Sequence, residues 1–377
     1  MTWAGRLIAA LLVCCVWPAF AQDEAPKQPP AEEVQEQVPT PLVIRELLVI
    51  HADRYDDTAN NVKLQRTALP AAIDSKQGRG KSTDDNDQYE YGPMPLGIIT
   101  LQGEIKEPMT VQIKMPASSS SIQANWPSDA IAGAQHLSWL TVRQADDEQR
   151  AKSFGEQGAW LAELREAEDR LWIQSRDPLR KERFLLYDAA FRFKSAIDVT
   201  ATDDQFGLKT NAPEQAAPPL SLLIRKQDTG WSTDGLSAPW ISRNPRIGQP
   251  DGDTKTSTSL DQALQPIQAL LEQRGYNAQE IGLALGMIGS AGVETSEMAL
   301  VYILPVGVID EYIAFDTKPM PDELIRTTIV VVNNVDPELG SRINDLIDDL
   351  SSDDWIKRDR AQRELINRKQ AAIPKVR

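Results

Sequence analysis

Between Leu42 and Thr233 the sequence consists of short segments rich in branched and aromatic residues, separated by polar turns. The first, Leu42–Ile50, is dense in Val, Ile and Leu and predicts a mostly buried strand. Further strands are expected at 96–105, 109–115, 137–142, 170–174, 182–193, 196–202, 205–210, 220–226 and 230–233. Many short strands joined by short turns are typical of a β-sandwich or barrel. We therefore expect a β-rich domain over residues 42–233.

Three local features are predicted within this region. Lys106-Glu107-Pro108 separates Leu96–Ile105 from Met109–Met115, which predicts a hairpin. Gln157–Asp169 is the one segment with helical spacing, because Trp160, Leu161 and Leu164 fall on one face. Residues 74–92, which are polar and contain Gly78 and Gly80, are expected to form a surface loop.

The pattern changes after residue 233. Residues 234–259 contain three prolines, three glycines and little apolar bulk, so we expect an interdomain segment there. Helices are predicted at 260–274 and 277–291, strands at 298–304, 312–316 and 324–335, and closing helices at 336–350 and 353–367. The predicted fold class is α+β, with a β-sandwich-like N-terminal domain followed by a smaller α+β domain (260–377) that ends in two helices.

The N-terminus predicts export. Arg6 precedes an unbroken apolar run, Leu7–Trp17, and Ala19-Phe20-Ala21 has the small-x-small pattern of a signal peptidase site. Eleven apolar residues are too few to span about 30 Å of hydrocarbon, so we expect a signal peptide over 1–21, cleaved before Gln22. Residues 22–41 are rich in proline and acidic residues and predict a disordered linker. The expected location is the periplasm or the cell exterior.

Cleavage would change the composition. Both cysteines, Cys14 and Cys15, lie in the signal, so the mature chain could form no disulfide and no thiolate metal site. Loss of Arg6 leaves 39 basic against 55 acidic residues over 356 positions, a net charge of 39 − 55 = −16. Such a charge repels nucleic acid, which we exclude as a main partner.

Motifs for cofactors and metals are incomplete. Gly80-Lys81-Ser82-Thr83 resembles the end of a phosphate-binding loop, but Ser75 stands where the first glycine belongs. Asp251-Gly-Asp253 and the acidic run 84–87 lack the remaining calcium ligands, and the chain has only two histidines. We expect solvated loops, no cofactor and no metal.

The densest group of potentially catalytic residue types begins at His51 and includes Asp53, Asp56 and Asp57. It follows the first predicted strand, where loops often carry function. No nucleophile accompanies it, because Ser290 has Ile288 in place of the glycine of a nucleophile elbow. We expect a turn here and keep the four residues as binding candidates.

Seven tryptophans follow the predicted signal. Trp139, Trp160 and Trp172 lie within predicted strands or on an apolar helix face and are expected in the core. Trp231 and Trp240 lie near the interdomain segment, where an exposed indole could stack on a sugar face. These two are therefore further binding candidates.

Two spacing patterns occur in the helices of the predicted C-terminal domain. Gly282, Gly286 and Gly289 stripe the helix 277–291, which predicts close packing against a sheet or another helix. Asp354, Ala361 and Leu365 have the spacing of the second helix of a HEAT-like repeat, with a capping Asp, a small contact residue and a core Leu. One copy cannot build a solenoid, because each repeat needs stacked neighbours.

These features together carry a family resemblance. Trp160-Leu-Ala-Glu-Leu-Arg165, Glu182-Arg-Phe-Leu-Leu-Tyr-Asp188, Met298–Pro305 with Arg326, and the HEAT-like ending resemble uncharacterised secreted proteins of planctomycete-type bacteria. The resemblance covers 137–365 and implies an exported protein with a β-rich first part and a helical end. It implies no catalytic residues.

Two functions remain open from the sequence. The favoured one is a non-enzymatic envelope module that binds or scaffolds a protein or glycan. The alternative is a carboxylate-dependent hydrolase of extracellular polysaccharide. It would need two carboxyl groups facing one cleft, about 5–5.5 Å apart in a retaining enzyme or roughly 6.5–9.5 Å apart in an inverting one. Sequence spacing cannot show that distance.

Overall fold

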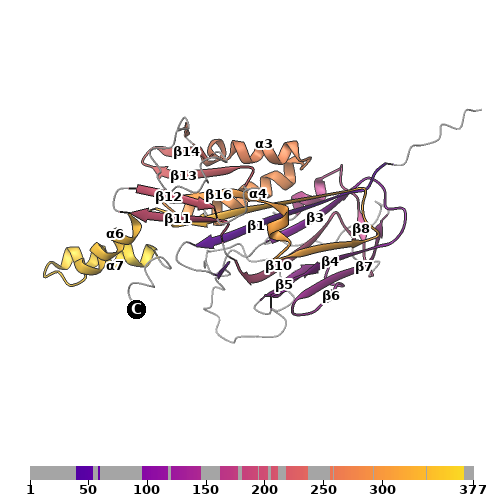
Figure 1. Ribbon diagram of the computed structural model, residues 1–377, viewed down its shortest axis with the longest axis horizontal. Helices are drawn as coiled ribbons and strands as arrows, with labels where there is room; N and C mark the ends of the chain where they lie inside the picture. Colours follow the sequence, from indigo (N-terminus) through magenta and orange to yellow (C-terminus); the bar gives the residue numbers. More distant parts are fainter. Residues whose placement is uncertain are drawn as a thin grey trace, which may run out of the picture. The chain divides into compact units, whose positions relative to one another are not determined.

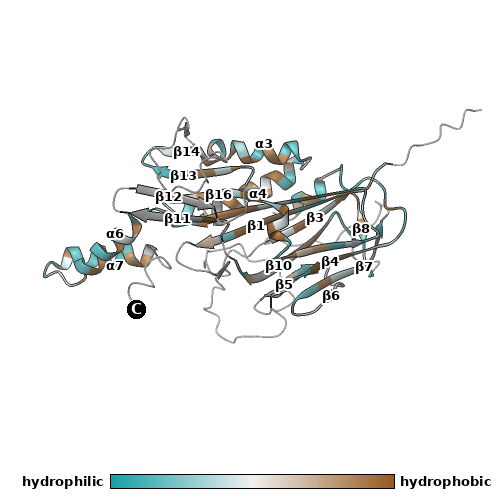
Figure 2. Ribbon diagram, in the orientation of Figure 1, coloured by the Kyte–Doolittle hydropathy of each residue, from teal (hydrophilic) through white to brown (hydrophobic). Residues whose placement is uncertain are grey.

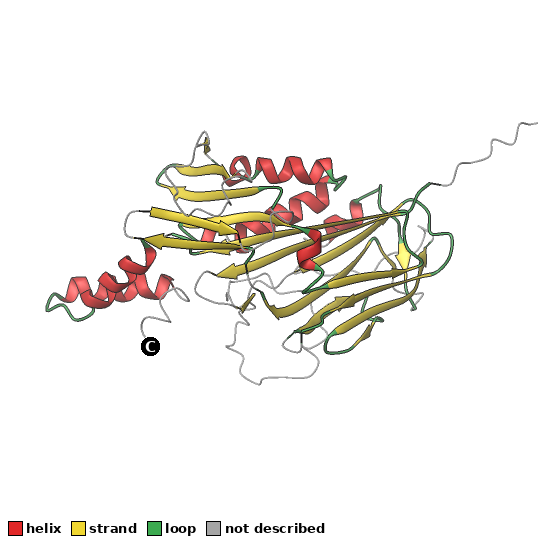
Figure 3. Ribbon diagram, viewed as in Figure 1, coloured by secondary structure: helices red, strands yellow, loops and turns green. Residues whose placement is uncertain are grey.

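The computed structural model describes residues 40–53, 58–59, 96–117, 120–145, 162–176, 181–193, 195–202, 205–210, 218–236, 255–257, 259–291, 293–336 and 338–368. These residues form a mixed α+β fold whose last two elements are helices, which confirms the predicted fold class (Figure 3). None of the helices among them is both long enough and apolar enough to cross a membrane.

The main sheet has ten strands in the order β15–β14–β13–β16–β18–β1–β3–β10–β2, and β5 also pairs with β10 (Figure 1). Its strands are β1 (Val43–Asp53), β2 (Thr58–Ala59), β3 (Leu96–Gln102), β5 (Ser121–Trp126), β10 (Phe184–Arg192), β13 (Ser221–Gln227), β14 (Gly230–Leu236), β15 (Lys255–Ser257), β16 (Met298–Leu304) and β18 (Glu323–Asn333). β1 and β18 are parallel over eleven residue pairs, from Val43–Glu323 to Asp53–Asn333. The remaining pairs are antiparallel.

A second sheet of six strands covers one face of the main sheet. Its order is β17–β4–β7–β8–β9, with β6 beside β7. The strands are β4 (Met109–Lys114), β6 (Ile131–Ala132), β7 (His136–Gln144), β8 (Ile173–Gln174), β9 (Lys181–Glu182) and β17 (Ala314–Lys318). One core joins the sheets, because Ile44 and Ile50 of β1 cluster with Val111 of β4 and Trp139 of β7. The strands β11 (Ile197–Thr202) and β12 (Gln205–Thr210) form a separate hairpin.

Helices cover the opposite face of the main sheet. They are α2 (Leu260–Ala263), α3 (Gln265–Gln273) and α4 (Ala278–Ala291). Leu47 and Val49, which alternate along β1 with the residues that face the second sheet, cluster with Ile267 and Ile288 of these helices. β1 is therefore buried on both faces, which explains its near-continuous apolar sequence. Figure 2 shows hydrophobic residues along the central strands and hydrophilic ones on the outer side of α3.

The strands on the two sides of segment 234–259 belong to one sheet. β13 pairs with β16, and β1 pairs with β18. Both large cores also contain residues from 42–233 and from 260–377. The expectation of two separately packed domains is therefore corrected, because one hydrogen-bonded sheet contains strands from both 42–233 and 260–377.

Two local predictions are also corrected. β3 and β4 lie in different sheets, so Lys106-Glu107-Pro108 connects the sheets and does not close a hairpin. A Cβ at Gly282 or Gly286 would meet no atom of the described residues within 4 Å beyond the backbone of its own helix, so among these three glycines only Gly289 packs closely, against Leu260. Of the predicted helix 157–169, residues 157–161 lie outside the described part of the chain, Ala162 is helical, and Glu163–Glu166 form a 3-10 turn, η2.

The described part of the chain ends in a helical hairpin, α6 (Leu339–Asp349) and α7 (Trp355–Arg368), with a small core of its own. Asp354 caps α7, because its Oδ1 accepts a hydrogen bond from the Ile356 amide at 2.9 Å. Ala361 and Leu365 are buried against Leu339, Ile343 and Leu346 of α6. The predicted roles of these three residues are confirmed.

Candidate functional site

The binding candidates that follow the first strand are not in a turn. His51 and Asp53 belong to β1, and His51 is buried with 1% of its surface exposed. Asp53 stands opposite Asn333 at the end of the parallel pair of strands. The prediction of a turn at His51 is wrong because β18 continues to pair with β1 through this segment. Asp56 and Asp57 lie outside the described residues.

The predicted core and binding tryptophans differ in burial. Trp139 is fully buried and donates its Nε1 hydrogen to the carbonyl oxygen of Pro127 at 3.1 Å, which confirms its core role. Trp172 is only half-buried, and the Arg183 guanidinium lies 5.1 Å from its ring centroid. Trp231, on β14, is half-buried with the Lys226 ammonium 5.9 Å from its ring centroid. Trp160 and Trp240 lie outside the described part of the chain.

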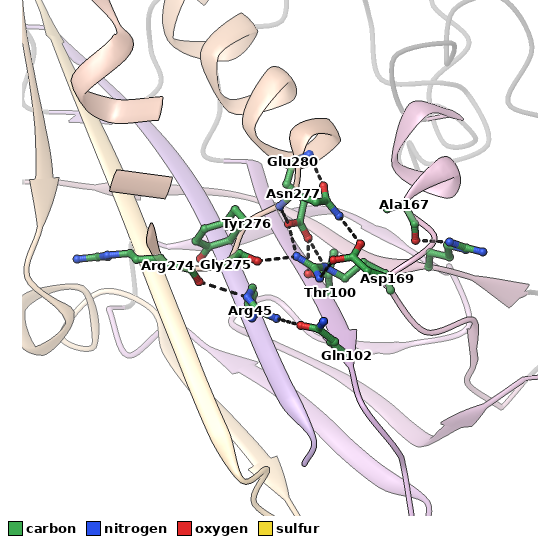
Figure 4. Close-up of polar contacts among 12 residues, drawn as sticks. Arg45, Thr100, Gln102, Ala167, Asp169, Arg274, Gly275, Tyr276, Asn277 and Glu280 are labelled. Carbon is green, nitrogen blue, oxygen red and sulfur yellow. Dashed lines mark hydrogen bonds and ion pairs between the residues drawn. The ribbon is translucent and has the colours of Figure 1, made fainter. Parts of the chain in front are cut away.

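A polar cluster that was not predicted forms where α4 begins (Figure 4). The Glu280 amide donates to Asn277 Oδ1, and the Asn277 amide donates to Glu280 Oε2, both at 2.9 Å. This reciprocal arrangement is a capping box, with asparagine in place of serine or threonine. The N-x-x-E spacing is visible in the sequence and is the signal that could have located it.

Glu280 also anchors the helix to a distant segment. Its Oε1 accepts from Arg170 Nε at 2.9 Å and its Oε2 from Arg170 Nη2 at 2.7 Å, while Thr100 of β3 donates to Oε1 at 2.6 Å. Arg170 further donates to Asp169 Oδ2 at 2.6 Å and to the Gly275 carbonyl at 2.9 Å. Burial would lower the pKa of Arg170, but its hydrogen bonds and attraction to Glu280 raise it overall.

The turn before α4 docks on β1. Gly275 has a φ of +75°, and a Cβ there would lie 2.7 Å from Nη2 of Arg45. Arg45 Nη1 donates to Gln102 Oε1 at 2.8 Å, and Tyr276 donates its hydroxyl hydrogen to the Glu46 carbonyl oxygen at 2.8 Å. Burial, followed by repulsion from Arg170, lowers the pKa of Arg45. Only a glycine suits this turn, since it needs both a left-handed backbone and space for the guanidinium.

A second ion pair lies on the opposite face of β1. Glu46 is fully buried, and it accepts hydrogen bonds from Arg326 Nε and from the Tyr187 hydroxyl, both at 2.5 Å. Arg326 also donates to the Ile313 carbonyl at 3.0 Å and pairs with Asp310. Tyr187 reaches Glu46 across Gly97 of β3, where a Cβ would lie 2.1 Å from the ring. Burial raises the pKa of Tyr187.

These buried carboxylates have structural partners. Glu46, Glu182 and Glu280 each accept hydrogen bonds from an arginine: Arg326, Arg165 and Arg170 respectively. An ion pair of this kind fixes the relative position of elements, and its loss leaves an uncompensated buried charge. Within the described residues, no three His, Cys, Asp or Glu side chains gather closely enough to hold a metal ion.

Three exposed large apolar side chains belong to α7, two at its start and one near its end. Trp355, Ile356 and Ile366 expose 64%, 60% and 62% of their surfaces. α7 uses Ala361 and Leu365 to pack on α6, so these three lie away from the small core of the hairpin. Large apolar residues grouped on one exposed element are typical of an interaction surface. We name Trp355, Ile356 and Ile366 the α7 apolar surface.

No protein-family model matches this chain, and no curated protein matches it with significance.

Proposed function

We propose that this chain is an exported envelope protein that acts as a non-enzymatic binding or scaffolding module for a protein or glycan partner. Export is supported by the charged start, the apolar run Leu7–Trp17 and the Ala19-Phe20-Ala21 site. The N-terminal residues that carry this argument lie outside the described part of the chain.

The α7 apolar surface is the observation that carries the binding proposal. A helical hairpin of repeat type buries only part of its apolar surface and gains stability from a stacked neighbour. A protein is the better-supported partner, because two of the three exposed side chains are isoleucines, which cannot stack on a sugar ring. Trp231 supports a glycan less well, because Lys226 lies over its ring, where a sugar would have to stack.

One observation favours the alternative, a carboxylate-dependent hydrolase. Burial raises the pKa of Glu182, as a general acid requires, although Arg165 opposes the shift. Both Glu182 oxygens, however, accept hydrogen bonds from Arg165. A general acid needs a proton free to reach the substrate, so this arrangement supports a structural role better than a catalytic one.

The test is a capture experiment from envelope extract of the source cells with immobilised mature protein. Wild type should retain a specific partner, and the double variant Trp355→Ala/Ile366→Ala should lose it. Met320→Ala is the matched control, because Met320 is 85% exposed and lies in the turn between β17 and β18. Equal capture by wild type and the double variant would overturn the role of α7. Polysaccharide hydrolysis that Glu182→Gln abolishes would favour the enzyme instead.

A further inference from the structure

We propose that the α7 apolar surface binds a second copy of this chain, with the two α7 helices antiparallel about a twofold axis. This inference rests on the proposed function, and it names the partner of that surface. Four observations support it: the spacing of the exposed residues along α7, their order, the residues beside them and the charges that the pairing would bring together.

The spacing places four residues on one side of α7. Trp355, Asp359, Gln362 and Ile366 are separated by four, three and four positions, so they form one stripe along the helix. Trp355, Gln362 and Ile366 are exposed, and Asp359 is partly so. Ala361 and Leu365, which contact α6, point in a different direction. The stripe is therefore accessible while α6 stays in place.

The stripe has the same order of residue types whether it is read from its N-terminal or its C-terminal end. It is apolar, polar, polar, apolar, with its centre midway between Asp359 and Gln362. An antiparallel second helix would place Trp355 against the partner's Ile366, and Asp359 against the partner's Gln362. In antiparallel helix pairs, a stripe with alternating spacings of four and three residues pairs in this way, each residue facing the one at the opposite position in the partner's stripe. A twofold axis repeats each contact, so the surface is complementary to itself.

The flanking residues suit the same pairing. Ile356 and Arg363 lie on one side of the stripe, and antiparallel pairing brings each beside the other from the partner. The aliphatic part of the Arg363 side chain can then cover Ile356 while its guanidinium stays in water. No two like charges are brought face to face.

The charges within the stripe add complementarity. Asp359 and Arg363 already form an ion pair within α7. In the antiparallel pair, Asp359 would also lie near the partner's Arg363, so two such pairs could be shared across the interface. Parallel pairing would instead place Asp359 directly against the partner's Asp359, which is repulsive.

The interface should be small. α7 has 14 residues and is about 21 Å long, and one side of such a helix buries less than a standard interface. The dimer should therefore be weak and concentration-dependent. A twofold contact is closed, so assembly should stop at two copies.

Sedimentation velocity of the mature protein from about 1 µM to about 1 mM, the range of weak dissociation constants, tests the association. Wild type and Met320→Ala should shift from monomer to dimer with concentration, and Trp355→Ala/Ile366→Ala should stay monomeric. Circular dichroism of the double variant should match wild type, because neither side chain belongs to the small core of the hairpin. A wild-type monomer at every concentration, or species larger than dimers, would overturn the proposal.

Cysteine cross-linking tests the direction, because the mature chain is expected to contain no cysteine. Asp359→Cys and Gln362→Cys variants, mixed and oxidised, should form the mixed disulfide. Each variant alone should cross-link poorly, because its two cysteines would be offset by three residues along the helices, beyond the Cα separation that a disulfide allows. Predominant same-variant disulfides would indicate parallel helices and contradict the proposal.

The two proposals fail separately. A monomeric wild type that still captures an envelope partner through α7 would leave the proposed function standing and remove self-association. A dimer that captures nothing further would support self-association and argue against a separate partner.

Discussion

Arg170 and Glu280 lie 110 positions apart in the sequence and face each other in a buried, two-pronged ion pair, with hydrogen bonds of 2.9 and 2.7 Å. The pair joins the segment after η2 to the start of α4. It also lies over β3, because Thr100 donates to the same carboxylate. One carboxylate thus fixes a loop, a helix start and a strand.

Removing one member of this pair should be costly. Arg170→Met leaves the Glu280 charge buried, so the free energy of unfolding should fall by about 3–5 kcal/mol. Adding Glu280→Gln removes that charge, and the double variant should recover part of the loss. Urea unfolding of the two single variants and the double variant measures the coupling. The control is Lys114→Met, whose exposed pair with Asp316 should be worth about 0–1 kcal/mol. Additive losses from Arg170 and Glu280 would contradict a coupled pair.

Two glycine substitutions should have opposite effects. Gly97→Ala places a methyl group 2.1 Å from the Tyr187 ring, and should cost about 1–3 kcal/mol of unfolding free energy. Gly282→Ala enters open space on a helix and should add about 0.5–1 kcal/mol. Thermal melts of both variants give the signs. Combined with Tyr187→Ala, Gly97→Ala should cost less than it does alone, because no ring remains to clash. An unchanged cost would mean that the ring is not the obstacle.

Glu182 should make stability depend on pH. Burial raises its pKa above the ordinary 4.5, and Arg165 opposes this only in part. The folded state therefore holds the proton more tightly than the unfolded state. This contribution to the free energy of unfolding is fully present below the unfolded pKa and is lost as the pH rises through the folded pKa. The variant Glu182→Gln lacks this pH-dependent contribution.

Urea unfolding of wild type and Glu182→Gln between about pH 4.5 and pH 7 isolates this contribution. The stability of wild type relative to the variant should increase as the pH falls. The opposite slope would show that attraction to Arg165 outweighs burial.

The expected signal peptidase site gives a direct test of the proposed export. N-terminal sequencing of the protein from the envelope fraction should begin at Gln22, because Ala19-Phe20-Ala21 fits the specificity of signal peptidase. An intact Met1, or recovery from the cytoplasmic fraction, would contradict export.

Local sequence patterns predicted most elements and few of their partners. The branched residues of β1, β16 and β18 identified those strands, since burial on both faces demands a continuous apolar run. Their pairing is not local: β1 pairs with β18, about 280 positions later, and no periodicity records that. β5 was missed because Ser121-Ile-Gln-Ala-Asn-Trp126 contains few branched residues.

The polar cluster shows the same limit. The capping box of Asn277 and Glu280 is readable at a spacing of three residues, whereas Arg170 is recognisable only once the chain has folded. The prediction of close packing along the glycine stripe of α4 was wrong for a different reason. A stripe of small residues permits close packing without requiring it, and a Cβ added at Gly282 or Gly286 would meet no atom of the described residues within 4 Å beyond the backbone of α4.

The parallel pairing of β1 with β18 has a consequence for biogenesis. β1 is the first described strand, and its neighbour on one side arrives only with Glu323–Asn333. A chain delivered N-terminus first across a membrane would carry an open strand edge until most of its length had crossed. Contacts of such long sequence separation form slowly. In an exported chain, the same delay would keep the polypeptide unfolded enough to pass a narrow channel, and the open edge would need a chaperone to shield it.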